Sequence, residues 1–154
     1  MDAGGALLGC YCLRMQDSQL ATRIADSFNR QGLMRTLGAR LVDISRGRVV
    51  VEVPFAETVT QQNGYFHAAV SAAIADTAGG YAALTTMEAE DDVLAVEFKI
   101  NLLRPAVGER LTAEAVVLKE GRTLTVCQST VRAWSGERST VVAVMMQTNM
   151  RMRA

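Results

Sequence analysis

The chain has 154 residues, of which 49% are hydrophobic and 21% are charged, and its 16 Lys and Arg balance its 16 Asp and Glu. This length suits one domain, and a neutral chain lacks the basic surface with which proteins bind nucleic acid, so we expect no nucleic-acid partner. The longest apolar runs are shorter than the roughly 20 residues of a membrane span, and Asp2 stands where an export signal carries a basic residue. We therefore expect a soluble, cytoplasmic protein with no membrane partner.

The composition also disfavours metal and disulfide chemistry. The chain has one histidine and three cysteines, Cys10, Cys12 and Cys127. These residues form neither a zinc-binding pattern nor an even disulfide framework. We expect reduced thiols without a functional role and a site without a metal.

The first predicted element is a helix that follows an N-terminal extension. Residues 1–16 contain several glycines and no hydrophobic period, which is typical of a flexible extension, and we assign residues 17–154 to a single domain. From Asp17 onward, apolar residues recur at helical spacing. The predicted apolar face of this helix consists of Leu20, Ile24, Phe28 and Leu33.

A β-hairpin follows. Residues 40–44 and 49–54 are rich in β-formers, and the turn between them contains Gly47, which can adopt a positive φ angle. A loop over residues 55–65 then leads to the segment around which we expect the rest of the chain to fold.

That segment is a helix from about His67, built almost entirely of small residues. Val70, Ile74 and Tyr81 recur at helical spacing among many alanines, which predicts a helix enclosed by other structure. One carboxylate, Asp76, lies in its middle, where aspartate has poor helix propensity. Asp76 is therefore either a structural hydrogen-bond acceptor or a functional group.

The second half of the chain has the period of β-strands. Leu94, Val96, Phe98, Ile100 and Leu102 alternate with more polar residues, which predicts one buried and one wetter face. Further strands are expected at 111–118, 123–133 and 139–148, and the acidic stretch at 88–92 is expected to be a solvated corner. With four strands in meander order after the helix, the simplest assembly is an α+β roll with an antiparallel sheet around the helix.

Two segments carry a family resemblance: QQNGYFHAAVSAAIADTAGGYAA and VEFKINLLRPAVGERLTAEAVVLKEGRTLTV. Over about residues 28–150 the chain resembles hotdog-fold acyl-CoA thioesterases of the phenylacetate-degradation (PaaI-like) type. The resemblance implies an antiparallel sheet wrapped around a long central helix, with two chains joined edge to edge. It also implies homodimers with shared active sites, often doubled into homotetramers, and no cofactor apart from the coenzyme A of the substrate.

The resemblance also assigns the site residues. The family's catalytic carboxylate corresponds to Asp76, and its orienting asparagine corresponds to Gln61. Gly64 matches the loop glycine, with Asn63 as an alternative orienting amide that would contact substrate. The family's His-Gly-Gly segment corresponds to His67, Ala68 and Ala69, so both glycines are alanine here.

These residues imply hydrolysis of a small, aryl or medium-chain acyl-CoA. The thioester carbonyl would accept hydrogen bonds from amides near Ala68 and Ala69, where the helix dipole favours negative charge. Asp76 would act as general base or as nucleophile, and these two roles stay open. His67 fits a positioning role or a helix cap, and Gln61 fits either water positioning or loop structure.

Of two alternatives to hydrolysis, the first remains open at this point and the second is disfavoured. The change of both glycines to alanine would suit a non-catalytic acyl-CoA-binding module, a sensor or scaffold. A hotdog hydratase needs a paired Asp and His, which His67 and Asp76 on one helix cannot form. Their nine-residue separation corresponds to about 13 Å along a helix, so Asp76 can serve a carbonyl held at a helix N-terminus only if that helix belongs to a second chain.

Overall fold

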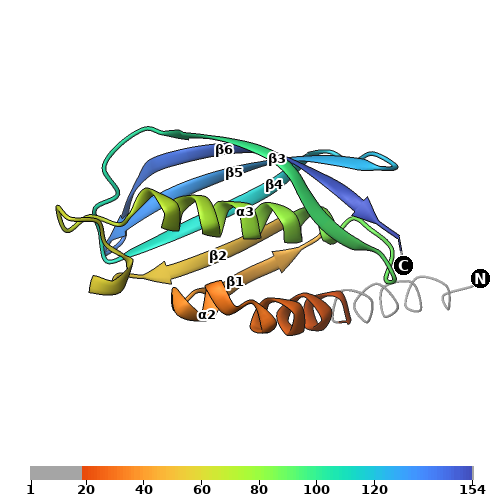
Figure 1. Ribbon diagram of the computed structural model, residues 1–154, viewed down its shortest axis with the longest axis horizontal. Helices are drawn as coiled ribbons and strands as arrows, with labels where there is room; N and C mark the ends of the chain where they lie inside the picture. The colour runs from red at the N-terminus through yellow and green to blue at the C-terminus, as the bar shows by residue number, and fades with distance from the viewer. Residues whose placement is uncertain (1–18, 154) are drawn as a thin grey trace, which may run out of the picture.

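The computed structural model describes residues 19–153, so the predicted extension at residues 1–16, with Cys10 and Cys12, lies outside the described residues. Figure 1 shows a curved sheet, with one long helix lying across its concave face. The elements follow in chain order: a helical stretch over residues 19–30, α2 Gly32–Thr36, β1 Arg40–Ser45, β2 Arg48–Pro54, η1 Glu57–Val59, α3 Ala68–Leu84, β3 Asp92–Leu102, β4 Arg110–Lys119, β5 Leu124–Ser135 and β6 Arg138–Met152. The predicted α+β class, the hairpin and the helix that follows His67 are confirmed.

The sheet has six antiparallel strands in the order β1-β2-β4-β5-β6-β3. The predicted meander is correct for β4, β5 and β6 but wrong for β3, which pairs with β6 at the far edge instead of with β4. Strands that follow each other in sequence usually pair in the sheet, but not always. Here β6 and β5 lie between β3 and β4, so the segment that joins β3 to β4 crosses both of them.

Helix α3 packs against β2, β3, β4, β5 and β6, so it fills the concave face of the sheet. Ala75, Ala78 and Ala82 are fully buried, and they share the core with small strand residues such as Ala113 and Ala115. Small side chains on both surfaces let the helix backbone approach the sheet closely and pack at interior density. The alanine-rich composition that marked this helix therefore sets its distance from the sheet.

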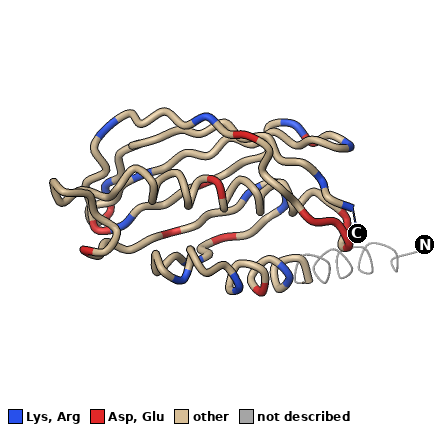
Figure 2. The backbone as a smooth tube through the Cα atoms, viewed as in Figure 1, with Lys and Arg blue, Asp and Glu red and all other residues tan. Residues whose placement is uncertain are grey.

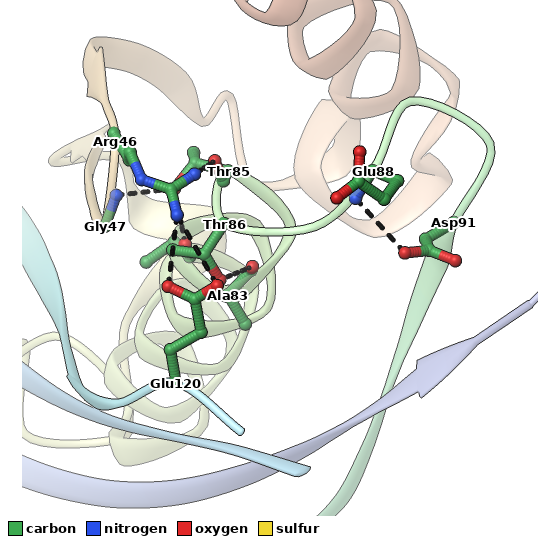
Figure 3. Close-up of polar contacts among 9 residues, drawn as sticks. Arg46, Gly47, Ala83, Thr85, Thr86, Glu88, Asp91 and Glu120 are labelled. Carbon is green, nitrogen blue, oxygen red and sulfur yellow. Dashed lines mark hydrogen bonds and ion pairs between the residues drawn. The ribbon is translucent and has the colours of Figure 1, made fainter. Parts of the chain in front are cut away.

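The C-terminal end of α3 is fixed to two strand connections (Figure 3). The hydroxyl of Thr85 accepts a hydrogen bond from the backbone N–H of Gly47, at 2.6 Å, and donates to the Ala82 carbonyl. Arg46 reaches from the same turn to Glu120, at 3.1 Å. Gly47 has the predicted positive φ, 73°. These contacts hold the helix axis relative to the sheet, and with it the position of every side chain on α3.

The acidic stretch after α3 is only in part the solvated corner that we predicted, because Glu88, Glu90 and Asp92 are exposed but Asp91 is buried. Asp91 is 7% exposed, its carboxylate forms an ion pair with Arg151 at 3.3 Å, and it accepts the backbone N–H of Glu88 (Figure 3). Arg23 also donates to the Asp91 backbone carbonyl. The corner is thus a polar junction that ties the N-terminal helical stretch to β6.

The N-terminal helical stretch contributes Ile24 and Phe28 to the core, as predicted. Leu33 was predicted on the same face but is 57% exposed. The helical stretch stops at residue 30, and a new helix, α2, starts at Gly32 after a break at Gln31, and Met34 is buried in place of Leu33. Spacing extrapolated across a helix break fails for this reason.

Strand β3 departs most from its predicted burial. Leu94, Val96, Phe98 and Leu102 are 47–56% exposed. Two features explain this: β3 is an edge strand with a strand neighbour on one side only, and a bulge between Ala95 and Glu97 breaks the alternation. The prediction that Leu94 shares a face with Phe98 is therefore wrong. Phe98, Ile100 and Leu102 do share the helix-facing side, since they pair with Gln147, Met145 and Ala143 of β6.

Candidate active site

Asp76 is the only charged residue on α3. Figure 2 shows that most charged positions lie instead on the strands, the connections and the N-terminal helical stretch around that helix. Asp76 is half-buried, and burial raises the pKa of its carboxyl group because the charged form loses water. Oδ1 of the carboxylate accepts a hydrogen bond from Nε2 of Gln147, at 2.6 Å. An isolated carboxylate with a raised pKa at a cavity wall is a group suited to proton transfer.

Asp76 opens into a cavity of about 210 Å³ between α3, the N-terminal helical stretch and strands β3 and β6. Most of its lining is polar. Nε2 of Gln31 donates to the Tyr81 hydroxyl at 2.9 Å, and that hydroxyl donates to Ser27 at 3.0 Å. The full lining is Ser27, Gln31, Asp76, Thr77, Gly80, Tyr81, Asp92, Val93, Ala95, Gln147 and Asn149.

The start of α3 holds the second group of predicted residues. His67 is the N-cap residue of the helix, and its Nδ1 accepts the backbone N–H of Ala69 at 2.9 Å. The capping role considered for His67 is therefore present in the structure. Ala68 and Ala69 are both exposed, but in the single chain the Ala69 amide is already engaged by the histidine. The Ala68 amide is the first of the helix and lies beyond the reach of the intrahelical ladder.

The loop before α3 is built around Gln61. Its side-chain Oε1 accepts the backbone N–H of Asn63, and its backbone carbonyl accepts that of Gly64 at 2.9 Å. Gly64 has φ 78°, a conformation that side chains rarely adopt, so a glycine is required to close this turn. Asn63 and Gly64 are exposed at the loop tip.

A second, more apolar cavity of about 320 Å³ lies beside this loop. It is lined by Gln61, Tyr65, Phe66, Ala68, Ser71, Leu102, Arg104, Pro105, Ala106 and Val142. The structure thus brings Gln61 and Ala68 together but places Asp76 in the other cavity, about 13 Å farther along the helix. Within one chain, the predicted site residues therefore lie in two separate groups.

Gln147 is the residue at Asp76 that we did not anticipate. It belongs to the helix-facing row of β6, which changes from Ala143 and Met145 to Gln147 and Asn149. Polar residues that continue a buried alternation are the sequence signal that could have identified it.

The arginines and the lysine considered for coenzyme A phosphates are dispersed. Arg104 borders the apolar cavity and donates to the Val141 carbonyl at 3.1 Å, whereas Arg122 lies in a different cleft, next to Arg151 and Arg153. Lys119 is exposed at the end of β4. Among the described residues, no group of three or more His, Cys, Asp or Glu side chains could hold a metal ion. None of the described helices is long and apolar enough to cross a membrane.

Comparison with known proteins identifies the family. Residues 63–146, more than half of the chain, match the family model described as the thioesterase superfamily. The chain belongs to the thioesterase superfamily. The predicted hotdog fold and the predicted class of enzyme, a thioester hydrolase, are thereby confirmed.

Individual members of the thioesterase superfamily agree with this assignment. A crystal structure of a thioesterase family protein from Silicibacter pomeroyi is 44% identical, covers 88% of this chain and 99% of its own, and superposes with a TM-score of 0.85. The 1,4-dihydroxy-2-naphthoyl-CoA hydrolase of Listeria monocytogenes is 31% identical over 91 residues, which are 59% of this chain and 74% of that enzyme. The PaaI protein of the phenylacetic acid degradation operon of Escherichia coli shares the fold, with a TM-score of 0.77 at 21% identity over 90% of this chain and 94% of its own.

Proposed function

We propose that this protein hydrolyses acyl-CoA thioesters to the free acid and coenzyme A, with Asp76 as the general base or the nucleophile. The observation that carries the proposal is the single half-buried carboxylate of α3, whose pKa is raised by burial and which opens into a cavity. The acyl group is expected to be small, aryl or medium-chain, as the family resemblance implies. No metal or cofactor takes part in this scheme.

Either role of Asp76 gives a balanced reaction. As a general base, the carboxylate takes a proton from water, the hydroxide oxygen bonds to the carbonyl carbon, the C–S bond breaks, and Asp76 returns the proton to the departing coenzyme A thiolate. As a nucleophile, the carboxylate oxygen bonds to the carbonyl carbon, the thiolate leaves, and water hydrolyses the resulting anhydride. In both cases, negative charge develops on the carbonyl oxygen and needs hydrogen-bond donors.

We further propose that these donors come from a second chain. A base acts within about 3 Å of its proton or through one water, whereas the amides at the start of the same helix are about 13 Å away. Two chains related by a two-fold axis can place Asp76 of one beside Gln61, His67 and Ala68 of the other, which gives two equivalent sites. The exposed apolar side chains of the edge strand β3 support such a homodimer. We propose that dimers double into a homotetramer and that the protein is cytoplasmic.

The activity is tested with a panel of acetyl-, octanoyl-, phenylacetyl- and palmitoyl-CoA, with thiol release measured by a chromogenic reagent. We expect turnover of at least one of the first three and a loss of at least about 100-fold in kcat for Asp76→Asn, which removes the basic oxygen without changing the volume. An Asp76→Asn protein that melts like the wild type and still turns over would remove Asp76 from the mechanism. No turnover of any member by the wild-type protein would contradict the proposed substrate class.

A further inference from the structure

The contact that the proposed mechanism leaves unused is the one between Asp76 and the buried amide of Gln147. Gln147 is 1% exposed and lies on the helix-facing side of β6, opposite Cys127 of β5 and Phe98 of β3. Its Nε2 lies 2.6 Å from Oδ1 of Asp76 and 3.2 Å from the backbone oxygen of the same residue. The Gln147 amide therefore contacts both the side-chain carboxylate and the backbone carbonyl of Asp76.

The second of these contacts fixes the orientation of the amide. A backbone carbonyl oxygen only accepts hydrogen bonds, so the Gln147 atom that faces the Asp76 carbonyl must be the nitrogen. Gln147 thus presents an N–H donor to the carboxylate, whether or not the carboxyl group is protonated. A donor that cannot reverse favours the ionised form of Asp76, and it opposes the effect of burial.

Gly79, one turn along α3, makes room for this amide. A Cβ atom added at Gly79 would lie 1.8 Å from Oε1 of Gln147, far inside contact distance. Glycine in the middle of a helix is unfavourable compared with alanine, so the chain carries a destabilising residue where Gln147 needs space. Oε1 itself is buried and has no hydrogen-bond partner among the described residues. Within the described part of the chain, the amide is therefore held by Asp76 alone.

We propose that Gln147 is a positioning residue that keeps Asp76 ionised and directed for thioester hydrolysis, with Gly79 providing the space it requires. This inference rests on the proposed function. The other titratable groups that face Asp76 across its cavity are Tyr81 on α3 and Asp92 on β3. The N-terminal helical stretch and β6 contribute only uncharged side chains to the lining.

The main test is a carbon-13 NMR titration of the Asp76 carboxyl group in the ligand-free, full-length protein. Loss of a hydrogen bond to a charged group corresponds to about one to two pKa units, so Gln147→Leu is expected to raise the pKa of Asp76 by that amount. The acid limb of the pH profile of kcat/KM, measured with the fastest substrate of the acyl-CoA panel, should move to higher pH by the same amount. A Gln147→Leu protein that is folded and shows neither shift would overturn the proposal.

Further variants separate positioning from a general effect on folding. Gln147→Met keeps the length of the side chain and should shift the acid limb as Gln147→Leu does, which keeps the test decisive if the leucine variant does not fold. Gly79→Ala removes no polar atom but displaces Oε1, so it should shift the limb in the same direction. Thr148→Val is the matched control, because its hydroxyl bonds to Glu97 on the opposite face of the sheet. A shift for Thr148→Val as large as that for Gln147→Leu would refute the role of Gln147.

The two proposals fail separately. If Asp76→Asn remains active, the proposed role of Asp76 is refuted. The NMR titration of the wild-type and Gln147→Leu proteins still measures whether Gln147 sets the pKa of Asp76. If Asp76→Asn is inactive and the Gln147 variants keep the wild-type titration and acid limb, only the positioning role falls.

Discussion

Mixing two inactive variants tests the shared site most directly. Asp76→Asn removes the carboxylate, and Ala68→Pro removes the amide at the start of α3. Ala68 is the first residue of the helix, where proline is favoured, and His67 before it has φ −64° and ψ 140°, the extended conformation that precedes proline. The substitution should therefore delete one hydrogen-bond donor and leave the helix intact.

The expected magnitudes follow from the geometry. Loss of one oxyanion donor costs about 10²–10³ in kcat, and loss of the base costs at least about 10², so each variant alone is nearly inactive. After random reassembly of equal amounts, half of the dimers are mixed. Each mixed dimer pairs the intact carboxylate of one chain with the intact amide of the other at one of its two sites. About a quarter of wild-type activity should therefore return.

The assay requires proof that subunits exchange. The two variants are dissociated in mild denaturant, mixed and refolded, and differently tagged chains are recovered by sequential affinity purification to count the mixed species. Each variant refolded alone is the control. Mixed dimers without recovered activity, or a fully active monomer, would refute a site built from two chains.

Three further predictions concern stability and reactivity. In sedimentation experiments, Phe98→Ala should weaken self-association more than Lys99→Ala does. The reason is that Phe98 is 47% exposed in a single chain and an interface would bury it. Equal effects of the two substitutions would contradict an interface on that face of β3. Burial raises the folded-state pKa of Asp76 above its unfolded value of about 3.9, so the free energy of unfolding should fall as pH rises from about 4 through the raised pKa. Over that pH range, urea titrations should show Asp76→Asn gaining stability relative to the wild type. No gain would count against the raised pKa. Burial raises the pKa of Cys127 to about 11, so peptide-resolved alkylation at pH 8 should label this thiol only after unfolding, and rapid labelling of the folded protein would contradict its burial.

The sequence predicted those features that depend on local pattern. The small residues of α3 and the Gly47 turn identified the helix and hairpin, because helix period and turn chemistry act within a few residues. The place of β3 was mispredicted because pairing with β6 depends on a crossover connection that leaves no periodic signal. The bulge before Glu97 then reversed the alternation for Leu94.

The candidate site was predicted unevenly for a similar reason. Asp76 and His67 could be named because each is an unusual residue within a helix of small residues, and the family resemblance gave them roles. Gln147 was missed: the polar end of the buried alternation on β6 marks its position, but its partner on α3 is 71 residues away and the contact exists only after the sheet curves around the helix. The polar lining from Ser27 and Gln31 was missed because it depends on how the N-terminal helical stretch docks on Tyr81.

The exposed edge strand β3 also affects how readily a newly synthesised chain can aggregate. A single folded subunit presents an open row of backbone donors and acceptors next to apolar side chains on β3, and such an edge can template misassembly with any other extended segment. Glu97 and Lys99 interrupt the apolar run in the middle of that strand, and the adjacent bulge twists it. Charges within an apolar edge strand are the pattern of gatekeeper residues, which oppose the indiscriminate stacking that leads to insoluble aggregates.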